Sequence, residues 1–133
     1  MTIGYSTTFP WGGPTNFVQK IIAGEKLHTI RQDVKKRWRP GMSIQHVIGN
    51  RTKQRRTFAS GTCEAVQDIC IRFTHIGEIW EVSVDDNCID DWNVIAANDG
   101  LTVEHFERWF HASSENGVFR GRIIHFTGKT FYR

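Results

Sequence analysis

The sequence predicts a single α+β domain over residues 1–133, built as a small, mostly antiparallel β-barrel of five to six strands with two or three flanking helices. Apolar residues recur at every second position in several short segments separated by short turns, a pattern typical of antiparallel strands. Two segments with helical apolar spacing lie in the early and later parts of the chain and do not alternate with strands. With 39% apolar residues, a chain of this length can bury a core without disulfides or a structural metal.

The first half of the chain is expected to hold three strands and one helix. Thr15 stands at an N-cap position before an apolar stripe at helical spacing, formed by Phe17, Val18, Ile21 and Ile22. Gly24 can end this helix by adopting a positive φ. Alternation and turn residues predict strands at 1–8, 26–31 and 43–49, loops at 9–14 and 32–41, and a basic hairpin tip at 51–56.

The second half is expected to hold the remaining strands and a second helix. A long or bent strand is predicted over 57–74, a half-buried strand over 79–85 with Trp80, Val82 and Val84 on one face, and a last strand over 119–127. Segment 90–97 has the pattern of a short helix, or of a strand followed by a helix, and ends at a turn signal in 98–100. Thr102 is expected to cap a helix on which Val103, Phe106 and Phe110 share a face.

The charges are unevenly distributed along the chain. Residues 1–56 hold 11 lysines and arginines against two acidic residues, and residues 57–133 hold six against 12. A basic half can form an electropositive face that attracts polyanions such as nucleic acids. The alternative is that the fold interleaves the two halves and the charges pair across the surface.

Cysteines, histidines and the first residues exclude several classes of protein. Three cysteines without CxxC spacing favour a reducing, cytoplasmic compartment over a disulfide framework or a zinc ribbon. The six histidines include no HxH or HExxH pattern, so no metal or other cofactor is expected. Neither a signal-peptide pattern at 1–6 nor an apolar run of membrane-spanning length is present, so no membrane partner is expected.

The best candidate for a site is the stretch 24–31, where a helix stop precedes polar residues on a strand. Lys26, Thr29 and Arg31 together with Asp99 could bind a polar base or move protons, since burial of a lysine favours its neutral form. The alternative is that Lys26 is solvated, Thr29 is an ordinary strand residue and Arg31 pairs with Asp33.

Aromatic residues within two loops are candidates for base stacking. Trp38 lies in a basic loop beside Arg37, and lysine or arginine next to a ring is what single-stranded nucleic acids prefer. Trp11 lies in the Pro- and Gly-rich loop and could stack on a base, although a loop tryptophan more often closes the end of a barrel. Trp38 could likewise fold back on the core.

The order of these motifs resembles that of the ASCH domains of the PUA superfamily. The resemblance rests on Gly24-x-Lys26-x-x-Thr29-x-Arg31, on the preceding helical segment 16–23, and on the following Arg37-Trp38-x-x-Gly41. It extends to Asn98-Asp99-Gly100 and the helical segment 104–110, and so spans most of the chain. The resemblance implies a small β-barrel with a cleft beside stretch 24–31 and a role in binding RNA or nucleotides.

Some small ASCH members are acetylcytidine amidohydrolases that use a lysine, a threonine and a glutamate. Lys26 and Thr29 match the first two positions, and the third falls near Asp99, one methylene shorter than glutamate. The charged insertions between residues 33 and 61 are more similar to longer phage and bacterial relatives. The resemblance thus implies a binding module for RNA, single-stranded nucleic acid or a modified nucleoside, with Gly24, Arg31, Arg37, Trp38 and Trp11 around the ligand. The alternatives are an amidohydrolase that removes an acyl group from the exocyclic amine of an acetylcytidine-like nucleoside, and, with less support, a ribonuclease.

Overall fold

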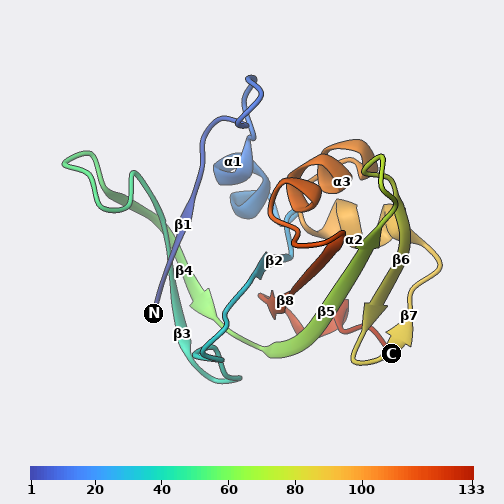
Figure 1. Ribbon diagram of the computed structural model, residues 1–133. Coiled ribbons are helices and arrows are strands. Elements are labelled where there is room, and N and C mark those ends of the chain that lie inside the picture. Colours follow the sequence, from blue (N-terminus) through green and yellow to red (C-terminus); the bar gives the residue numbers. More distant parts are fainter.

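A computed structural model describes residues 1–133 and has an α+β fold with mostly antiparallel sheets, as predicted (Figure 1). The strands are β1 (Thr2–Tyr5), β2 (His28–Arg31), β3 (Ser43–Ile48), β4 (Arg56–Thr62), β5 (Ala65–Phe73), β6 (Ile79–Val84), β7 (Asn87–Cys88) and β8 (Val118–His125). The helices are α1 (Phe17–Ile22), α2 (Trp92–Asn98) and α3 (Val103–Ala112), followed by the short 3-10 helix η1 (Gly128–Thr130).

The strands form two sheets, ordered β1-β3-β4 and β2-β8-β5-β6-β7. The predicted number of five to six strands is therefore too low, and the strand pairing does not form the single closed barrel that was expected. All pairs are antiparallel except β1 with β3, which is parallel because a long connection containing α1 and β2 separates the two strands.

The strand predicted over 57–74 is bent so sharply that it becomes two strands, β4 and β5, in different sheets (Figure 1). The bend lies at Cys63 and Glu64, whose backbone N–H groups donate in different directions. Cys63 N–H donates to Met42 O at 2.7 Å, beside the first sheet, and Glu64 N–H donates to His125 O at 2.9 Å in the second. This segment joins the two sheets covalently.

Helix α1 differs from the prediction in its cap and in its buried face. Its N-cap is Asn16, which has a left-handed φ of 58°, and Thr15 instead donates its hydroxyl hydrogen bond to Ser6 O at 2.6 Å. Only Phe17 of the predicted apolar stripe is fully buried; Ile21 is partly buried against the core, and Ile22 is 66% exposed. The predicted stop is confirmed, since Gly24 has a φ of +73°.

Strand β6 carries a bulge that overturns the predicted face of Trp80. Arg72 pairs with Glu81 and the next residue, Phe73, pairs with Ile79, so Trp80 has no partner and is turned outward. Trp80 is 56% exposed, whereas Val82 and Val84 are buried as predicted.

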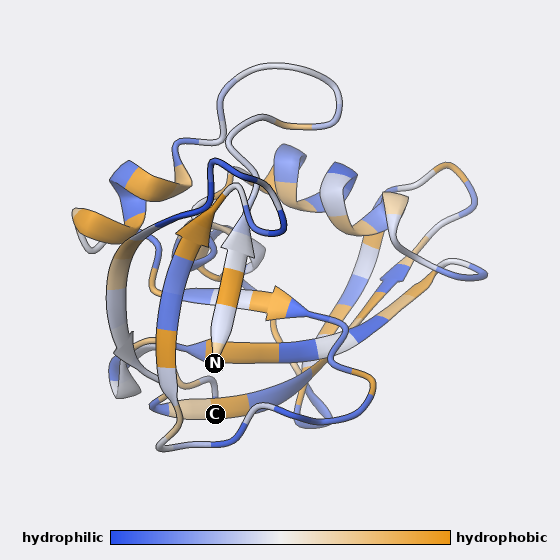
Figure 2. Ribbon diagram, turned by 90° about the vertical axis from the view of Figure 1, so that its left-hand side faces the viewer, coloured by the Kyte–Doolittle hydropathy of each residue, from blue (hydrophilic) through white to orange (hydrophobic).

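One hydrophobic core occupies the space between the sheets and the helices, and apolar and polar positions alternate along several strands (Figure 2). Helix α3 matches its prediction: the Thr102 side chain accepts from His105 N–H at its start, and Phe106 and Phe110 are buried. The ring of Phe110 lies 4.8 Å from that of Phe119 on β8, so α3 packs against the second sheet beside the C-terminal end of α2.

Candidate functional site

The site lies where the turn after α1 meets the end of α2. Gly24 reverses the chain, and Leu27 N–H then donates to Asn98 O at 2.7 Å, which fixes the start of β2 against the last residue of α2. Lys26 consequently faces Asp99, the C-cap of α2, although the two residues are far apart in the sequence.

The ammonium of Lys26 is held by both the backbone and the side chain of Asp99. Nζ donates to the Asp99 carbonyl oxygen at 2.7 Å and to Oδ1 at 3.2 Å. It also lies 4.7 Å from the centre of the Phe17 ring, a favourable position for a cation. Lys26 and Asp99 are each only 3% exposed, so the alternative of a solvated Lys26 is wrong.

Burial changes the protonation of this lysine. Loss of hydration lowers the pKa of Lys26 to about 8; the Asp99 carboxylate opposes this shift, and the charges of Arg31 and Lys20 add to it. At neutral pH a fraction of the protein therefore carries a neutral amine, which can accept a proton.

A cavity of about 80 Å³ adjoins the Lys26–Asp99 pair. Its polar wall includes Lys26, Thr29, Arg31 and Asp99, so the structure brings the four predicted side chains together. The Thr29 hydroxyl forms no hydrogen bond within the protein, and neither does Asp99 Oδ2. The apolar wall comes from Tyr5, Phe17, Ile30, Leu101, Trp109 and Phe110. Two oxygen atoms with free hydrogen-bonding capacity thus belong to residues of a cavity whose walls are partly polar and partly apolar.

Arg31 braces the cavity and does not form the expected alternative pair with Asp33. Its Nη2 donates to Gly4 O at 2.7 Å, which joins β2 of one sheet to β1 of the other, and its guanidinium lies 5.5 Å from the centre of the Tyr5 ring. Asp33 instead accepts from Arg122 Nη1 at 2.8 Å.

The remaining predicted ligand contacts lie outside this cavity. Trp38 is 5% exposed and belongs to the hydrophobic core, so its ring offers no face to a base. Trp11 stacks on Phe9 at 4.9 Å and lies 4.4 Å from the Arg108 guanidinium, so it packs against the protein, although there is no closed barrel for it to close. Arg37 is exposed on its loop, and Gly24 serves the backbone turn.

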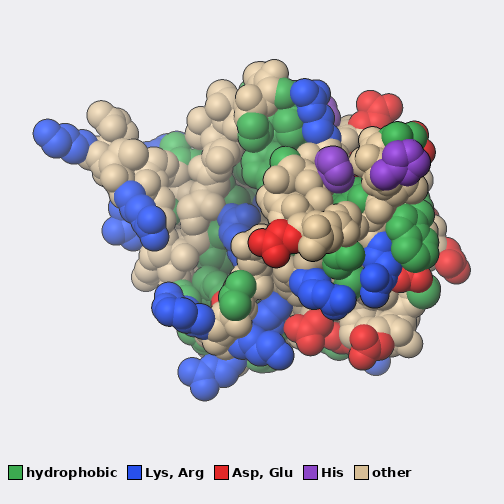
Figure 3. All heavy atoms as spheres, viewed as in Figure 1, with side chains coloured by type: hydrophobic (Ala, Val, Ile, Leu, Met, Phe, Trp, Pro, Cys, Tyr) green, Lys and Arg blue, Asp and Glu red, His purple; other side chains and the backbone are tan.

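Basic side chains gather on one side of the molecule. In Figure 3, lysines and arginines lie over the projecting β3–β4 hairpin and below it, whereas most acidic side chains lie toward the β6 side, together with some basic ones. The hairpin residues Arg51, Lys53, Arg55 and Arg56 are all exposed. The two halves of the sequence are not fully separated in space, because β2 pairs with β8 and Asp33 pairs with Arg122.

A surface hollow on this basic side adjoins the cavity. The hollow has a volume of about 390 Å³ and is lined by Gly4, Tyr5, Ser6, Gly49 and Asn50. The first three residues also line the cavity, and the last two begin the turn of the basic hairpin.

A larger hollow, of about 410 Å³, lies elsewhere, beside Asp33, Asp68 and Arg122. Arg122 contacts Asp33 at 2.8 Å and Asp68 at 3.6 Å there, whereas Lys36, Asp86 and Arg120, which also line the hollow, form no ion pair. We place the functional site at the smaller cavity, because only there do a buried lysine and a buried aspartate, Lys26 and Asp99, lie together.

Sequence reasoning missed two residues that support the site. His28 Nδ1 lies 3.2 Å from Asp99 Oδ1, and His28 Nε2 lies 2.7 Å from the Tyr132 hydroxyl. The position of His28, two residues after Lys26 on the same predicted strand, was a signal for its role. Nothing in the local sequence pattern indicated Tyr132.

Comparison with known proteins gives no relative, because no family model, no curated protein and no solved structure matches the chain. No cluster of three or more histidine, cysteine or acidic side chains is arranged to hold a metal ion. None of the helices has the length and apolar character needed to cross a membrane. The fold and the site define an α+β protein with a buried lysine–aspartate pair beside a small cavity.

Proposed function

We propose that this protein binds RNA or nucleotides as an ASCH-like domain and receives the polar edge of a base in the cavity beside Lys26. The observation that carries the proposal is the convergence of Lys26, Thr29 and Asp99 on a cavity that adjoins a hollow beside the basic hairpin. Membership of the ASCH domains and a cytoplasmic location belong to the same proposal. The order of the motifs in stretch 24–31 supports ASCH membership, and the three free cysteines support a cytoplasmic location.

The size of the cavity limits what enters it. Binding sites for whole small molecules usually have volumes of about 300 Å³ or more, whereas this cavity has about 80 Å³. It therefore takes only the edge or the exocyclic group of a base, and the sugar and phosphate remain in the adjoining hollow. Lys26 donates to an oxygen of the base, Asp99 Oδ2 accepts from an amino group, and the Thr29 hydroxyl does either.

The basic hairpin supplies affinity without reading sequence. Phosphate contacts by lysine and arginine release counterions, so binding by this face weakens as salt rises. The β3–β4 hairpin projects from its sheet (Figure 1). Its exposed basic residues can therefore contact the phosphates of a nucleic acid that lies across the hollow.

Fluorescence titration with a labelled single-stranded oligoribonucleotide tests this function. We expect binding at low salt that weakens as salt rises, and a smaller salt dependence, by about one unit of slope per lost phosphate contact, in the double variant Arg51→Ala/Lys53→Ala. Lys129→Ala/Arg133→Ala removes the same charge elsewhere and is the matched control. Absence of binding at low salt, or equal effects of the two double variants, would contradict the proposal.

A second candidate function is amide hydrolysis on an acylated nucleoside, and it is favoured by the direct contact of Lys26 with Asp99. Neutral Lys26 takes a proton from a water molecule, and the resulting hydroxide adds to the acyl carbon. The bond from that carbon to the exocyclic nitrogen then breaks, and the lysine proton passes to the leaving amine. Asp99 orients Lys26, and Thr29 positions the water or the acyl oxygen.

Incubation with acetylcytidine, followed by chromatographic separation of cytidine, tests the hydrolase. We expect turnover that rises with pH to a plateau above about 8, because the neutral amine is the base. Lys26→Met should be inactive and the exposed-loop variant Lys36→Met fully active. Failure of the wild-type protein to release cytidine, or equal rates for both variants, would remove this candidate.

A further inference from the structure

We propose that His28 and Tyr132 are positioning residues, which hold the Asp99 carboxylate against Lys26 through a directed chain of hydrogen bonds. This inference rests on the proposed function of the Lys26 cavity. Neither residue lines the cavity, so their role is exerted through Asp99.

The hydrogen bonds determine which nitrogen of His28 carries the proton. Asp99 Oδ1 can only accept, so His28 Nδ1 is the donor across the 3.2 Å contact. Burial lowers the pKa of His28, and the ring is therefore neutral and leaves Nε2 as an acceptor. Tyr132 donates its hydroxyl hydrogen to Nε2 at 2.7 Å, and its oxygen accepts from Asn98 Nδ2 at 3.0 Å.

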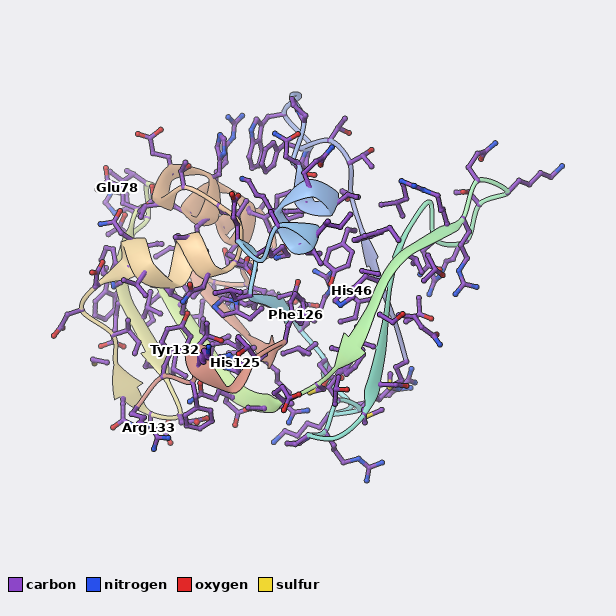
Figure 4. The ribbon with its side chains drawn as sticks, turned by 180° about the vertical axis from the view of Figure 1, so that it is seen from behind. His46, Glu78, His125, Phe126, Tyr132 and Arg133 are labelled. Carbon is purple, nitrogen blue, oxygen red and sulfur yellow. The ribbon has the colours of Figure 1, made fainter.

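Tyr132 is itself fixed by the side chain of Gln67, which is 1% exposed. Gln67 Oε1 accepts from Tyr132 N–H at 2.8 Å, and Gln67 Nε2 donates to Tyr132 O at 2.6 Å. The amide thus pairs with both backbone groups of one residue, as a neighbouring strand would. Figure 4 shows Tyr132 beside His125, whose Nε2 lies 2.9 Å from the same Gln67 oxygen.

The hydrogen bonds from His28 and Lys26 determine which oxygen of Asp99 remains free. His28 and Lys26 both donate to Oδ1, and Oδ2 has no protein partner. The carboxylate is therefore held by one oxygen and presents the other to a ligand. Without the donor from His28, rotation of the carboxylate would weaken its contact with Lys26 and its influence on the Lys26 charge.

The titration of Lys26 Nζ, followed by NMR of lysine-labelled protein, tests this role without any ligand. In Tyr132→Phe, we expect a downward shift of the Lys26 midpoint, since a less ordered Asp99 carboxylate stabilises the ammonium less well. Thr130→Val is the matched control, because it removes a hydrogen bond of 2.8 Å from His125 in the same C-terminal segment but does not touch His28. Thr130→Val should keep the wild-type midpoint.

A second pair of variants keeps the test decisive if Tyr132→Phe does not fold. His28→Asn places an amide donor near the position of Nδ1 but loses the contact with Tyr132, so it should lower the midpoint less than His28→Gln, which places its amide near Nε2 and loses the donor to Asp99. In ligand binding or turnover, the disruptive variants should lose about tenfold, a loss typical of removing a partner that orients a functional side chain.

Equal midpoints in Tyr132→Phe, Thr130→Val and the wild-type protein would overturn the positioning role. Equal shifts in Tyr132→Phe and Thr130→Val would also overturn it, because they would indicate a general loosening of the C-terminal segment. A shift confined to Tyr132→Phe, in a protein that binds no RNA and hydrolyses no acetylcytidine, would support the hydrogen-bond chain and reject the proposed function instead.

Discussion

Replacing Lys26 by methionine removes the buried ammonium and keeps an unbranched side chain of similar length. Burial lowers the pKa of Lys26 from 10.5 to about 8, so between these values the folded protein holds a neutral amine while the unfolded chain holds an ammonium. The unfolded state then binds more protons, and the free energy of unfolding rises with pH. Below about pH 8 the amine is protonated in both states and adds no pH dependence. The full shift corresponds to about 3 kcal/mol.

Urea unfolding at constant ionic strength, at intervals of about one pH unit from neutral to about pH 10, measures this contribution. Burial also raises the pKa of Tyr5 and of Cys63, which lowers stability in alkali, but these effects cancel in the difference between wild type and Lys26→Met. Above about pH 8, the free energy of unfolding of wild type should rise relative to that of Lys26→Met by up to about 1.4 kcal/mol per pH unit. The exposed-loop variant Lys36→Met should follow wild type. A difference that stays constant with pH would refute the reasoning.

Three further substitutions test the surroundings of the site. Gly100 has a φ of +80°, and a Cβ there would lie 3.2 Å from the Lys26 side chain. Gly100→Ala should therefore lower the free energy of unfolding by about 1–2 kcal/mol. An unchanged free energy in urea unfolding would argue against a strained turn. Tyr5→Phe leaves His46 Nδ1 without its partner at 2.7 Å and should cost about 1–3 kcal/mol, and an unchanged unfolding midpoint would contradict that contact. Thr102→Ala removes the cap of α3 and should cost about 1 kcal/mol, with Thr102→Ser as the control that retains the hydroxyl.

Elements whose cause is local could be predicted from the sequence. Helix α3 follows from its capping threonine and from the spacing of Phe106 and Phe110, and these features act within a few residues. The separation of β4 from β5 could not be predicted, because it depends on hydrogen bonds from Cys63 and Glu64 to distant strands. The outward turn of Trp80 likewise depends on a register shift against β5, which alternation along one strand does not reveal.

The candidate site was predictable only in part. Lys26, Thr29 and Asp99 were singled out by the motif order, although the spacing of residues did not show that they meet. Trp38 was a candidate for stacking because a basic loop surrounds it, but the loop carries its charges outward and packs this ring into the core. The role of Tyr132 depends on a side-chain amide that pairs with its backbone, a contact without a local sequence pattern.

The most direct test of the central claim is equilibrium binding of a single-stranded oligoribonucleotide to Thr29→Val. The Thr29 hydroxyl has no partner in the protein, so its removal should leave the free energy of unfolding unchanged or slightly higher. If the cavity receives a base edge, the lost hydrogen bond should weaken binding by about tenfold, while the salt dependence stays that of wild type. Binding of Thr29→Val as tight as that of wild type, in a variant shown to be folded, would contradict the claim that the cavity beside Lys26 reads the ligand.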